Sequence, residues 1–247
     1  MSRTLHIHAP LVTVRSAADG SSEPSNELLY GEAVEVLGGN GAWTHIRSTH
    51  DGYEGYVEQA LLSEHLEKQA KISAPVTHLY EQPDFKTTPR HALYFGSPVC
   101  VTDEKDNGFV RLANKGWVFE GHLVAIDHIA PDFVETALLF KHAPYIWGGR
   151  SAAGIDCSGL VQIALMAAGI PCPRDTKDQE ARIGEAISSD IESLKRGDLV
   201  YFKRHVGIMI DEREILNATS RHMSTALENV ADLAQIYGGI THVRRIS

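Results

Sequence analysis

One cysteine in this chain has neighbours that suit a nucleophile. Cys157 lies between Asp156 and the run Ser158-Gly159-Leu160, after which apolar residues recur at helical spacing. The pattern predicts a helix with Asp156 at its N-cap and Cys157 in its first turn. Unpaired backbone N–H groups and the helix dipole stabilise a thiolate there, so we predict a pKa below the roughly 8.5 of a free thiol. The alternative is a small buried cysteine that packs as a hydrophobe.

Two polar residues further along the chain could complete such a site. His205 begins a predicted strand, and its imidazole titrates in the range that a general base and leaving-group acid needs. Asn217 lies in the next predicted strand, where its carbonyl oxygen could accept the imidazole N–H and fix the tautomer. The alternatives are that Asn217 makes an ordinary strand hydrogen bond, or that His222 takes the orienting role.

The register of these two strands decides whether His205 and Asn217 can meet. A three-residue loop of Asp211–Arg213 would place Asn217 opposite Gly207, on the same face as His205. A slip by one residue would turn the amide to the other face. We therefore predict a contact between Asn217 and His205 across a glycine.

The elements that must position these residues occupy the second half of the chain. A cysteine-bearing helix followed by an antiparallel sheet that bears a histidine predicts an α+β, papain-like domain over residues 132–247. Helices are predicted at 132–140, 157–168, 190–194 and 227–236, a helix or loop after 176, and strands at 197–202, 205–210, 214–218 and 241–246.

The first half of the chain is an internal repeat with a period of about 65 residues. Ala9-Pro10 recurs as Ala74-Pro75, and Gly55-Tyr56-Val57 recurs as Gly116-Trp117-Val118. Short alternating runs between Gly, Asn, Asp and Pro predict two small all-β barrels, at residues 8–64 and 72–126. Packing within these barrels is the simplest role for their aromatic residues.

Composition narrows the class of partner. The chain has 247 residues, is 43% hydrophobic and carries a formal net charge of −9, which disfavours nucleic acid and anionic membranes as partners. No apolar run is long enough to span a bilayer, and the first residues lack the apolar core of a signal peptide. Three cysteines, Cys100, Cys157 and Cys172, are an odd number. We therefore expect a cytoplasmic protein without a cofactor or metal, whose oligomeric state is left open.

Several linked motifs resemble the NlpC/p60 family of cell-wall cysteine peptidases. Tyr145-x-Trp147-Gly148-Gly149, Asp-Cys-Ser-Gly-Leu from 156, Gly-Asp-Leu-Val-Tyr-Phe from 197 and His-Val-Gly-Ile from 205 follow one another in the family's order. The two barrels resemble bacterial SH3-like domains. A double barrel in front of such a domain resembles the subgroup that cuts free wall peptides after an N-terminal L-Ala-γ-D-Glu unit.

The resemblance implies roles for residues around the nucleophile. Tyr145 would lie near the thiol and donate to the oxyanion beside the backbone N–H of Cys157. Asp156 and Ser158 would contact polar end groups of the substrate, although helix capping alone also explains both. Arg174 is a candidate partner for a substrate carboxylate.

At one position the sequence departs from the family's pattern. The family usually has a histidine where this chain has Asn217, so we predict a Cys157–His205–Asn217 triad, with loss of activity as the alternative. Related enzymes also use an acidic residue and a tyrosine of the first barrel to hold the substrate amine. Tyr53, Glu54 and Tyr56 are the candidates here.

The resemblance implies a γ-D-glutamyl-diamino-acid endopeptidase that acts on small peptidoglycan peptides with a free N-terminal L-Ala, in cell-wall recycling. One alternative is an amidase or acyltransferase of the same fold that acts on a non-wall substrate. The other is a wall-binding protein with a decayed active site. Reactivity of Cys157 would exclude the decayed site, and the substrate turned over would separate the two enzymes.

Overall fold

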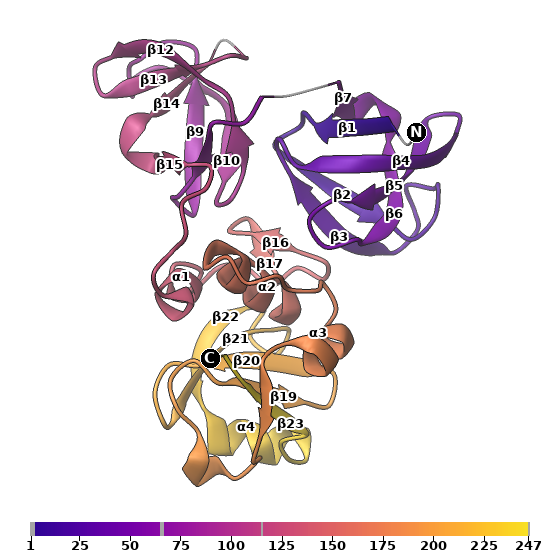
Figure 1. The fold of residues 1–247 in the computed structure, drawn as a ribbon, viewed down its shortest axis with the longest axis vertical. Helices are drawn as coiled ribbons and strands as arrows, with labels where there is room; N and C mark the ends of the chain where they lie inside the picture. Colours follow the sequence, from indigo (N-terminus) through magenta and orange to yellow (C-terminus); the bar gives the residue numbers. More distant parts are fainter. Residues whose placement is uncertain (1–2, 65–66, 115, 247) are drawn as a thin grey trace. The chain divides into compact units, whose positions relative to one another are not determined.

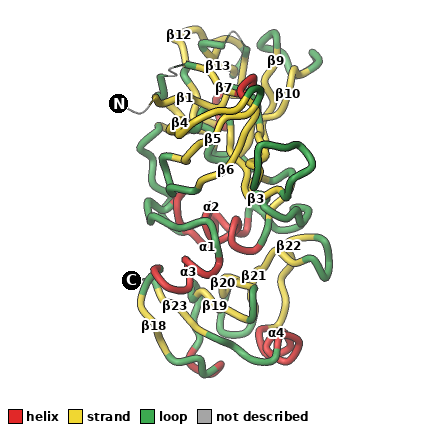
Figure 2. Tube along the Cα trace, turned by 90° about the vertical axis from the view of Figure 1, so that its right-hand side faces the viewer, coloured by secondary structure: helices red, strands yellow, loops and turns green. Residues whose placement is uncertain are grey.

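The chain divides into two units, Met1–His128 and Ile129–Ser247. The first unit is built of strands joined by tight turns. The computed structural model describes residues 3–64, 67–114 and 116–246 (Figure 1). Among these residues, α-helices occur only in the second unit, whereas the first consists of strands, loops and short 3-10 turns (Figure 2).

The first barrel is one antiparallel sheet in the order β3-β2-β6-β5-β4-β1-β7. Buried apolar and exposed polar residues alternate along its strands: Val12 and Val14 are buried in β2, while Thr13 between them is exposed. The sheet includes β1, which lies ahead of the predicted start at residue 8. The strands are β1 Arg3–Ile7, β2 Leu11–Arg15, β3 Pro24–Leu29, β4 Ala33–Asn40, β5 Trp43–Ser48, β6 Glu54–Glu58 and β7 Leu62–Ser63, with a 3-10 turn at Gln59–Leu61.

The second barrel repeats this topology, which confirms the internal repeat. Its sheets run β10-β9-β14-β13-β12 and β11-β8-β15, the order of the first barrel with the equivalent of β4 split into β11 and β12. The strands are β8 Ala70–Ile72, β9 Val76–Tyr80, β10 Pro89–Tyr94, β11 Pro98–Val99, β12 Val101–Asp106, β13 Phe109–Leu112, β14 Trp117–Phe119 and β15 Leu123–Ala125, with a 3-10 turn at Glu120–His122.

A glycine recurs in both barrels because two strands approach closely at that point. A Cβ on Gly55 would lie 2.4 Å from Cγ1 of Val14, and a Cβ on Gly116 would lie 2.4 Å from Cγ of Leu79. Any larger residue would push these strands apart. The repeated Gly-aromatic-Val motif therefore has a packing origin in each copy.

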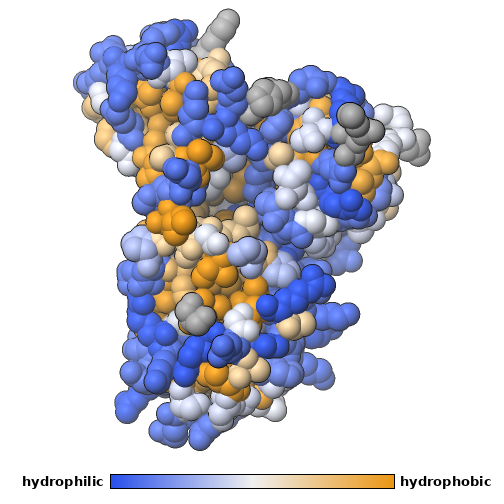
Figure 3. Space-filling model, viewed as in Figure 1, coloured by the Kyte–Doolittle hydropathy of each residue, from blue (hydrophilic) through white to orange (hydrophobic). Residues whose placement is uncertain are grey.

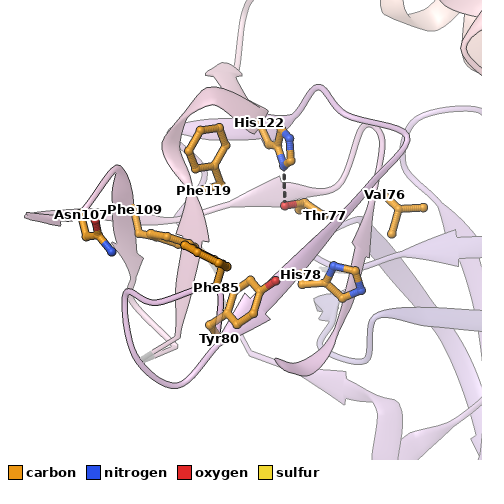
Figure 4. Close-up of a pocket in the computed structure, with 9 residues that line it drawn as sticks. All are labelled: Val76, Thr77, His78, Tyr80, Phe85, Asn107, Phe109, Phe119 and His122. Atoms are coloured by element: carbon orange, nitrogen blue, oxygen red, sulfur yellow. Dashed lines mark hydrogen bonds between the residues drawn. The ribbon is translucent and has the colours of Figure 1, made fainter. Parts of the chain in front are cut away.

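The second barrel carries a pocket of about 320 Å³ with aromatic walls (Figure 4). Phe109 lines it, with the rings of Tyr80 and Phe119 packed edge-on against Phe109 at centroid distances of 5.6 and 5.9 Å. Tyr80 and Phe119 are the last residues of β9 and β14. In the first barrel the equivalent strands, β2 and β6, end instead at Arg15 and Glu58. The aromatic pocket therefore belongs to this copy and is not required by the barrel fold.

The second unit has the predicted α+β architecture. Its main sheet is antiparallel in the order β18-β23-β19-β20-β21-β22, and α2 packs against β20 and β21. The elements are α1 Phe133–Leu138, β16 Arg150–Ser151, β17 Gly154–Ile155, α2 Cys157–Ala167, α3 Thr176–Arg182, β18 Glu185–Ile187, a 3-10 turn at Ile191–Ser193, β19 Leu199–Phe202, β20 His205–Met209, β21 Glu214–Thr219, β22 Ser224–Asn229, α4 Val230–Tyr237 and β23 His242–Arg245.

Helix α2 and the central strands form the best buried part of this unit. Every residue of α2 from Cys157 to Leu165 is buried, as is every residue of β19 and β20. Leu233 of α4 packs with Val200 and Met209 in the apolar core of the sheet. A nucleophile at the start of α2 and a base at the start of β20 are thus both held by rigid elements.

One element differs from the sequence prediction and affects the site. The predicted helix over residues 227–236 starts only at Val230, and residues 224–229 form β22. The helix begins late because the Asn229 side chain caps it, accepting a hydrogen bond from the Ala231 N–H at 2.9 Å. Glu228 is therefore a strand residue, paired with Ile215.

The described helices are short, and none is long and apolar enough to cross a bilayer. The longest is α2, with 11 residues. Hydrophilic residues cover most of the surface seen in Figure 3, with smaller hydrophobic areas between them.

Candidate active site

Helix α2 starts at Cys157 because Asp156 caps it, as predicted. Its carboxylate accepts a hydrogen bond from the Gly159 N–H at 2.7 Å. A Cβ on Gly159 would lie only 2.3 Å from the backbone oxygen of Gly149, so this glycine lets the preceding turn lie against the helix. Gly148, with φ of 80°, provides the left-handed bend in that turn.

A buried ion pair joins three of the predicted substrate-binding residues. The Arg174 guanidinium binds both carboxylate oxygens of Asp156, at 2.6 and 3.0 Å, and the Ser158 hydroxyl at 2.7 Å. Both charged side chains are almost fully buried, and removing one partner of such a pair costs about 3–5 kcal/mol. The cluster fixes the first turn of α2, and the roles predicted for these residues toward substrate stay predictions.

The sulfur of Cys157 receives hydrogen bonds from the Val206 backbone N–H and the Thr176 side chain. Burial nevertheless raises the pKa of the thiol to about 11, and the Asp156 charge acts in the same direction. The predicted low pKa is therefore wrong. Burial of the thiol raises its pKa by more than the helix N-terminus and these hydrogen bonds lower it. Cys157 is a neutral thiol at neutral pH.

His205 and Asn217 meet as the register argument predicts. Ile208 lies opposite Leu216, and the Ile210 N–H binds the Glu214 oxygen across the loop at 2.8 Å. Nε2 of His205 lies 2.9 Å from Oδ1 of Asn217. An amide oxygen can only accept, so Nε2 carries the proton in the neutral ring and Nδ1 keeps its lone pair. That is the tautomer a base needs if it takes a proton through Nδ1.

The environment of His205 keeps the ring neutral and fixed in place. Tyr237 of α4 stacks on it with a centroid distance of 4.8 Å and an interplanar angle of 13°. Burial lowers the pKa of His205 below its ordinary value, while the hydrogen bond to Asn217 acts in the opposite direction. At neutral pH the resting pair is therefore a thiol and an unprotonated imidazole.

Tyr145 is coupled electrostatically to the nucleophile. Burial raises the pKa of its hydroxyl, and the charge of a Cys157 thiolate adds to the shift. The hydroxyl thus stays protonated, as a hydrogen-bond donor must. Its backbone is held by a 2.9 Å hydrogen bond from the Tyr145 N–H to the Met223 oxygen.

The three candidates of the first barrel lie together at the hairpin of β5 and β6. Glu54 binds Arg47 at 2.7 and 2.9 Å. Tyr56 stacks on His45 at 4.8 Å, and the Tyr53 N–H binds the Asp51 carboxylate. These residues belong to the first unit, and their predicted role toward substrate stays a prediction.

Sequence reasoning missed Glu228 and Tyr237, and it placed His222 wrongly as a spare orienter. His222 binds Glu228 instead, with Nε2 3.1 Å from Oε1. A signal for Glu228 existed: Asn217 pairs with Ala226, and a residue two positions further lies on the same face of the sheet. Predicting a helix from residue 227 concealed it.

A helix that presents a cysteine to a histidine–amide pair on an antiparallel sheet defines the class of papain-like cysteine peptidases. Residues 142–238 match the model of the NlpC/P60 family, and residues 11–63 match that of the bacterial SH3 domain. Residues 142–238 thus form an NlpC/P60 domain, and residues 11–63 form a bacterial SH3 domain ahead of it.

Relatives with known names cover most of the chain. It is 28% identical to a Bacillus subtilis gamma-D-glutamyl-L-lysine dipeptidyl-peptidase, over 78% of this chain and 71% of the relative. It is 25% identical to dipeptidyl-peptidase 6 of Lysinibacillus sphaericus, over 85% and 86%. A crystal structure of an NlpC/P60 family protein from Bacillus cereus shares the fold over 98% and 99% of the two chains, with a TM-score of 0.83 and 20% identity.

The raised pKa of Cys157 predicts an unusual alkylation profile. Only the thiolate reacts efficiently with iodoacetamide, so the alkylation rate of Cys157 should keep rising with pH toward about 11. At neutral pH Cys157 should therefore react no faster than an ordinary buried thiol. Peptide mass spectrometry after timed labelling from about pH 6 to 10 measures each thiol separately. A plateau for Cys157 below about pH 8 would contradict the assignment of a neutral resting thiol.

Proposed function

We propose that this chain is a cysteine endopeptidase that hydrolyses the γ-D-glutamyl-diamino-acid amide bond of peptidoglycan-derived peptides with a free N-terminal L-Ala. The observation that carries the proposal is the 2.9 Å contact between His205 Nε2 and Asn217 Oδ1, within a unit whose cysteine lies at a helix start. The Bacillus subtilis relative, named for γ-D-glutamyl-L-lysine, supports this class of bond.

In the first half of the reaction, Cys157 attacks the γ-glutamyl carbonyl carbon. Its proton passes to Nδ1 of His205 as the S–C bond forms, because the resting thiol is neutral. The backbone N–H of Cys157 and the Tyr145 hydroxyl donate to the developing oxyanion. The imidazolium then returns the proton to the leaving amine of the diamino acid, and the C–N bond breaks.

In the second half, a water molecule hydrolyses the thioester. His205 takes a proton from the water through Nδ1 and delivers it to the departing sulfur, which restores the thiol. Asn217 holds Nε2–H throughout, so that the ring neither rotates nor changes tautomer. The products are the N-terminal dipeptide and the shortened peptide.

We further propose that the enzyme works on free fragments in the cytoplasm, as recycling requires. Cys100, Cys157 and Cys172 are all described residues, and all three remain thiols. A reducing compartment keeps cysteines in this state.

The substrate proposal predicts cleavage of L-Ala-γ-D-Glu-meso-diaminopimelate, or of the same tripeptide with L-Lys, to L-Ala-D-Glu and the free diamino acid. Acetylating the alanine should abolish cleavage, because it removes the free, charged amine that the proposed substrate carries. Mass spectrometry of the products measures both results.

Other outcomes select the alternative functions. Comparable rates on intact, cross-linked wall would favour a secreted remodelling enzyme. A Cys157 that alkylates while no wall peptide is cleaved would favour an amidase or acyltransferase of the same fold. A Cys157 that stays unreactive throughout would favour a wall-binding protein with a decayed site.

A further inference from the structure

We propose that Glu228 is a positioning residue that selects which end of the Asn217 side-chain amide faces His205. The inference rests on the proposed function, in which Asn217 orients the base. Nδ2 of Asn217 donates to Oε2 of Glu228 at 2.9 Å, while Oδ1 of the same amide lies 2.9 Å from Nε2 of His205. Glu228 thus binds the end of the amide that His205 does not use.

A selector is needed because an amide has two ends of nearly the same shape and opposite hydrogen-bonding character. With Nδ2 toward the ring, Asn217 would donate to Nε2 of His205. The ring proton would then move to Nδ1, and the lone pair that takes the thiol proton would be lost. A carboxylate can only accept, so Glu228 binds the amide in the productive orientation and repels it in the other.

Hydrogen bonds from Arg221 and His222 fix the Glu228 carboxylate in place and stabilise its ionised form. Arg221 binds both of its oxygens, at 2.6 and 2.7 Å, and His222 approaches at 3.1 Å. Burial opposes the charged form, but hydrogen bonds from Asn217, Arg221 and His222 outweigh it and hold the pKa of Glu228 below its ordinary value. The acceptor is therefore present across the neutral range.

Arg221, which binds Glu228, also contacts the aromatic ring that stacks on His205. The Arg221 guanidinium lies 5.8 Å from the centroid of Tyr237, the ring that stacks on His205. Arg221 lowers the pKa of His205 and Glu228 raises it, so the two charges act on the base in opposite directions. The main effect expected of Glu228 is therefore on orientation.

The polar and charged groups that act on His205, and the ring stacked on it, come from three elements and the turn between two of them. They are Asn217 of β21, Glu228 of β22, Tyr237 of α4 and Arg221 of the turn between β21 and β22. Losing the Glu228 charge leaves Arg221 unopposed. The pKa of His205 should then fall, and the acid limb of the rate profile should move to lower pH.

The test compares Glu228→Ala with Glu228→Gln, which keeps an oxygen able to accept from Asn217. We expect Glu228→Ala to lower kcat by roughly tenfold to a hundredfold with little change in KM, and Glu228→Gln to retain most of kcat. Nitrogen NMR of the His205 ring should show the proton on Nε2 in wild type and Glu228→Gln, and partly on Nδ1 in Glu228→Ala. Glu135→Ala, which removes another Arg-bound carboxylate of this unit, is the control and should change neither readout.

A double variant shows whether Glu228 acts through Asn217. Glu228→Ala should cost nothing further in an Asn217→Ala background, because the amide that it positions is absent. Additive losses, or full kcat with an unchanged tautomer in Glu228→Ala, would overturn the proposal. Should Glu228→Ala fail to fold, Glu228→Leu also removes both acceptor oxygens, and an unchanged ring tautomer in that variant would overturn the proposal. The NMR readout needs no substrate, so it decides the role of Glu228 even if no wall peptide is cleaved.

Discussion

Cys157→Ala should abolish peptide hydrolysis and leave the fold intact. The substitution removes the sulfur that forms the thioester, while the Asp156 cap and the ion pair with Arg174 still hold the start of α2. Residual rates should lie below roughly a hundredth of the wild-type rate, because water must then attack without covalent catalysis. Mass spectrometry of the released dipeptide measures the rate, and the melting temperature monitors the fold.

The matched control for this variant is Cys172→Ala. Cys172 is a second buried cysteine of the same unit, and it has no part in the proposed reaction. Its substitution should leave kcat within about twofold of wild type. If Cys157→Ala retained a larger fraction of activity than stated, Cys157 would no longer be the nucleophile.

Asn217→Ala should lower kcat by roughly tenfold to a thousandfold, because orienting the base is worth a few kcal/mol. The loss follows from the freed Nε2–H, for which the described residues offer no second hydrogen-bond acceptor. Asn217→His should retain activity. A neutral imidazole there can accept from His205 with one nitrogen and donate to Glu228 with the other, which preserves the two 2.9 Å contacts of the amide.

Steady-state kinetics and the ring tautomer of His205 together test the role of Asn217. Full activity in Asn217→Ala would remove it from the triad and leave a Cys157–His205 dyad. Loss of activity in both Asn217 variants, with the melting temperature preserved, would indicate that the site requires an amide and would contradict the equivalence of the two residues.

Local signals account for the parts of the site that the sequence predicts. A cap residue and helical spacing predict α2, and Gly169 and Pro171 mark its end, so the N-cap at Asp156 could be predicted from the sequence. The contact between His205 and Asn217 follows from strand alternation and the length of a single loop. Neither inference requires knowledge of distant parts of the chain.

Tertiary contacts account for what could not be predicted. Arg174 binds Asp156 from a segment beyond the end of α2, and burial reverses the expected direction of the Cys157 pKa shift. Strand β1 pairs with β4, Arg3 opposite Val36, so nothing near residue 3 signals that the barrel begins there. Loop length and spacing carry none of this information.

The neutral resting thiol has a consequence for the sensitivity of Cys157 to oxidation. Peroxide converts a thiolate to sulfenic acid far faster than it does a protonated thiol, and electrophilic metabolites show the same preference. With a pKa of about 11, Cys157 offers little thiolate at neutral pH. We therefore expect the substrate-free molecule to resist oxidative inactivation, so that its nucleophile is preserved between turnovers.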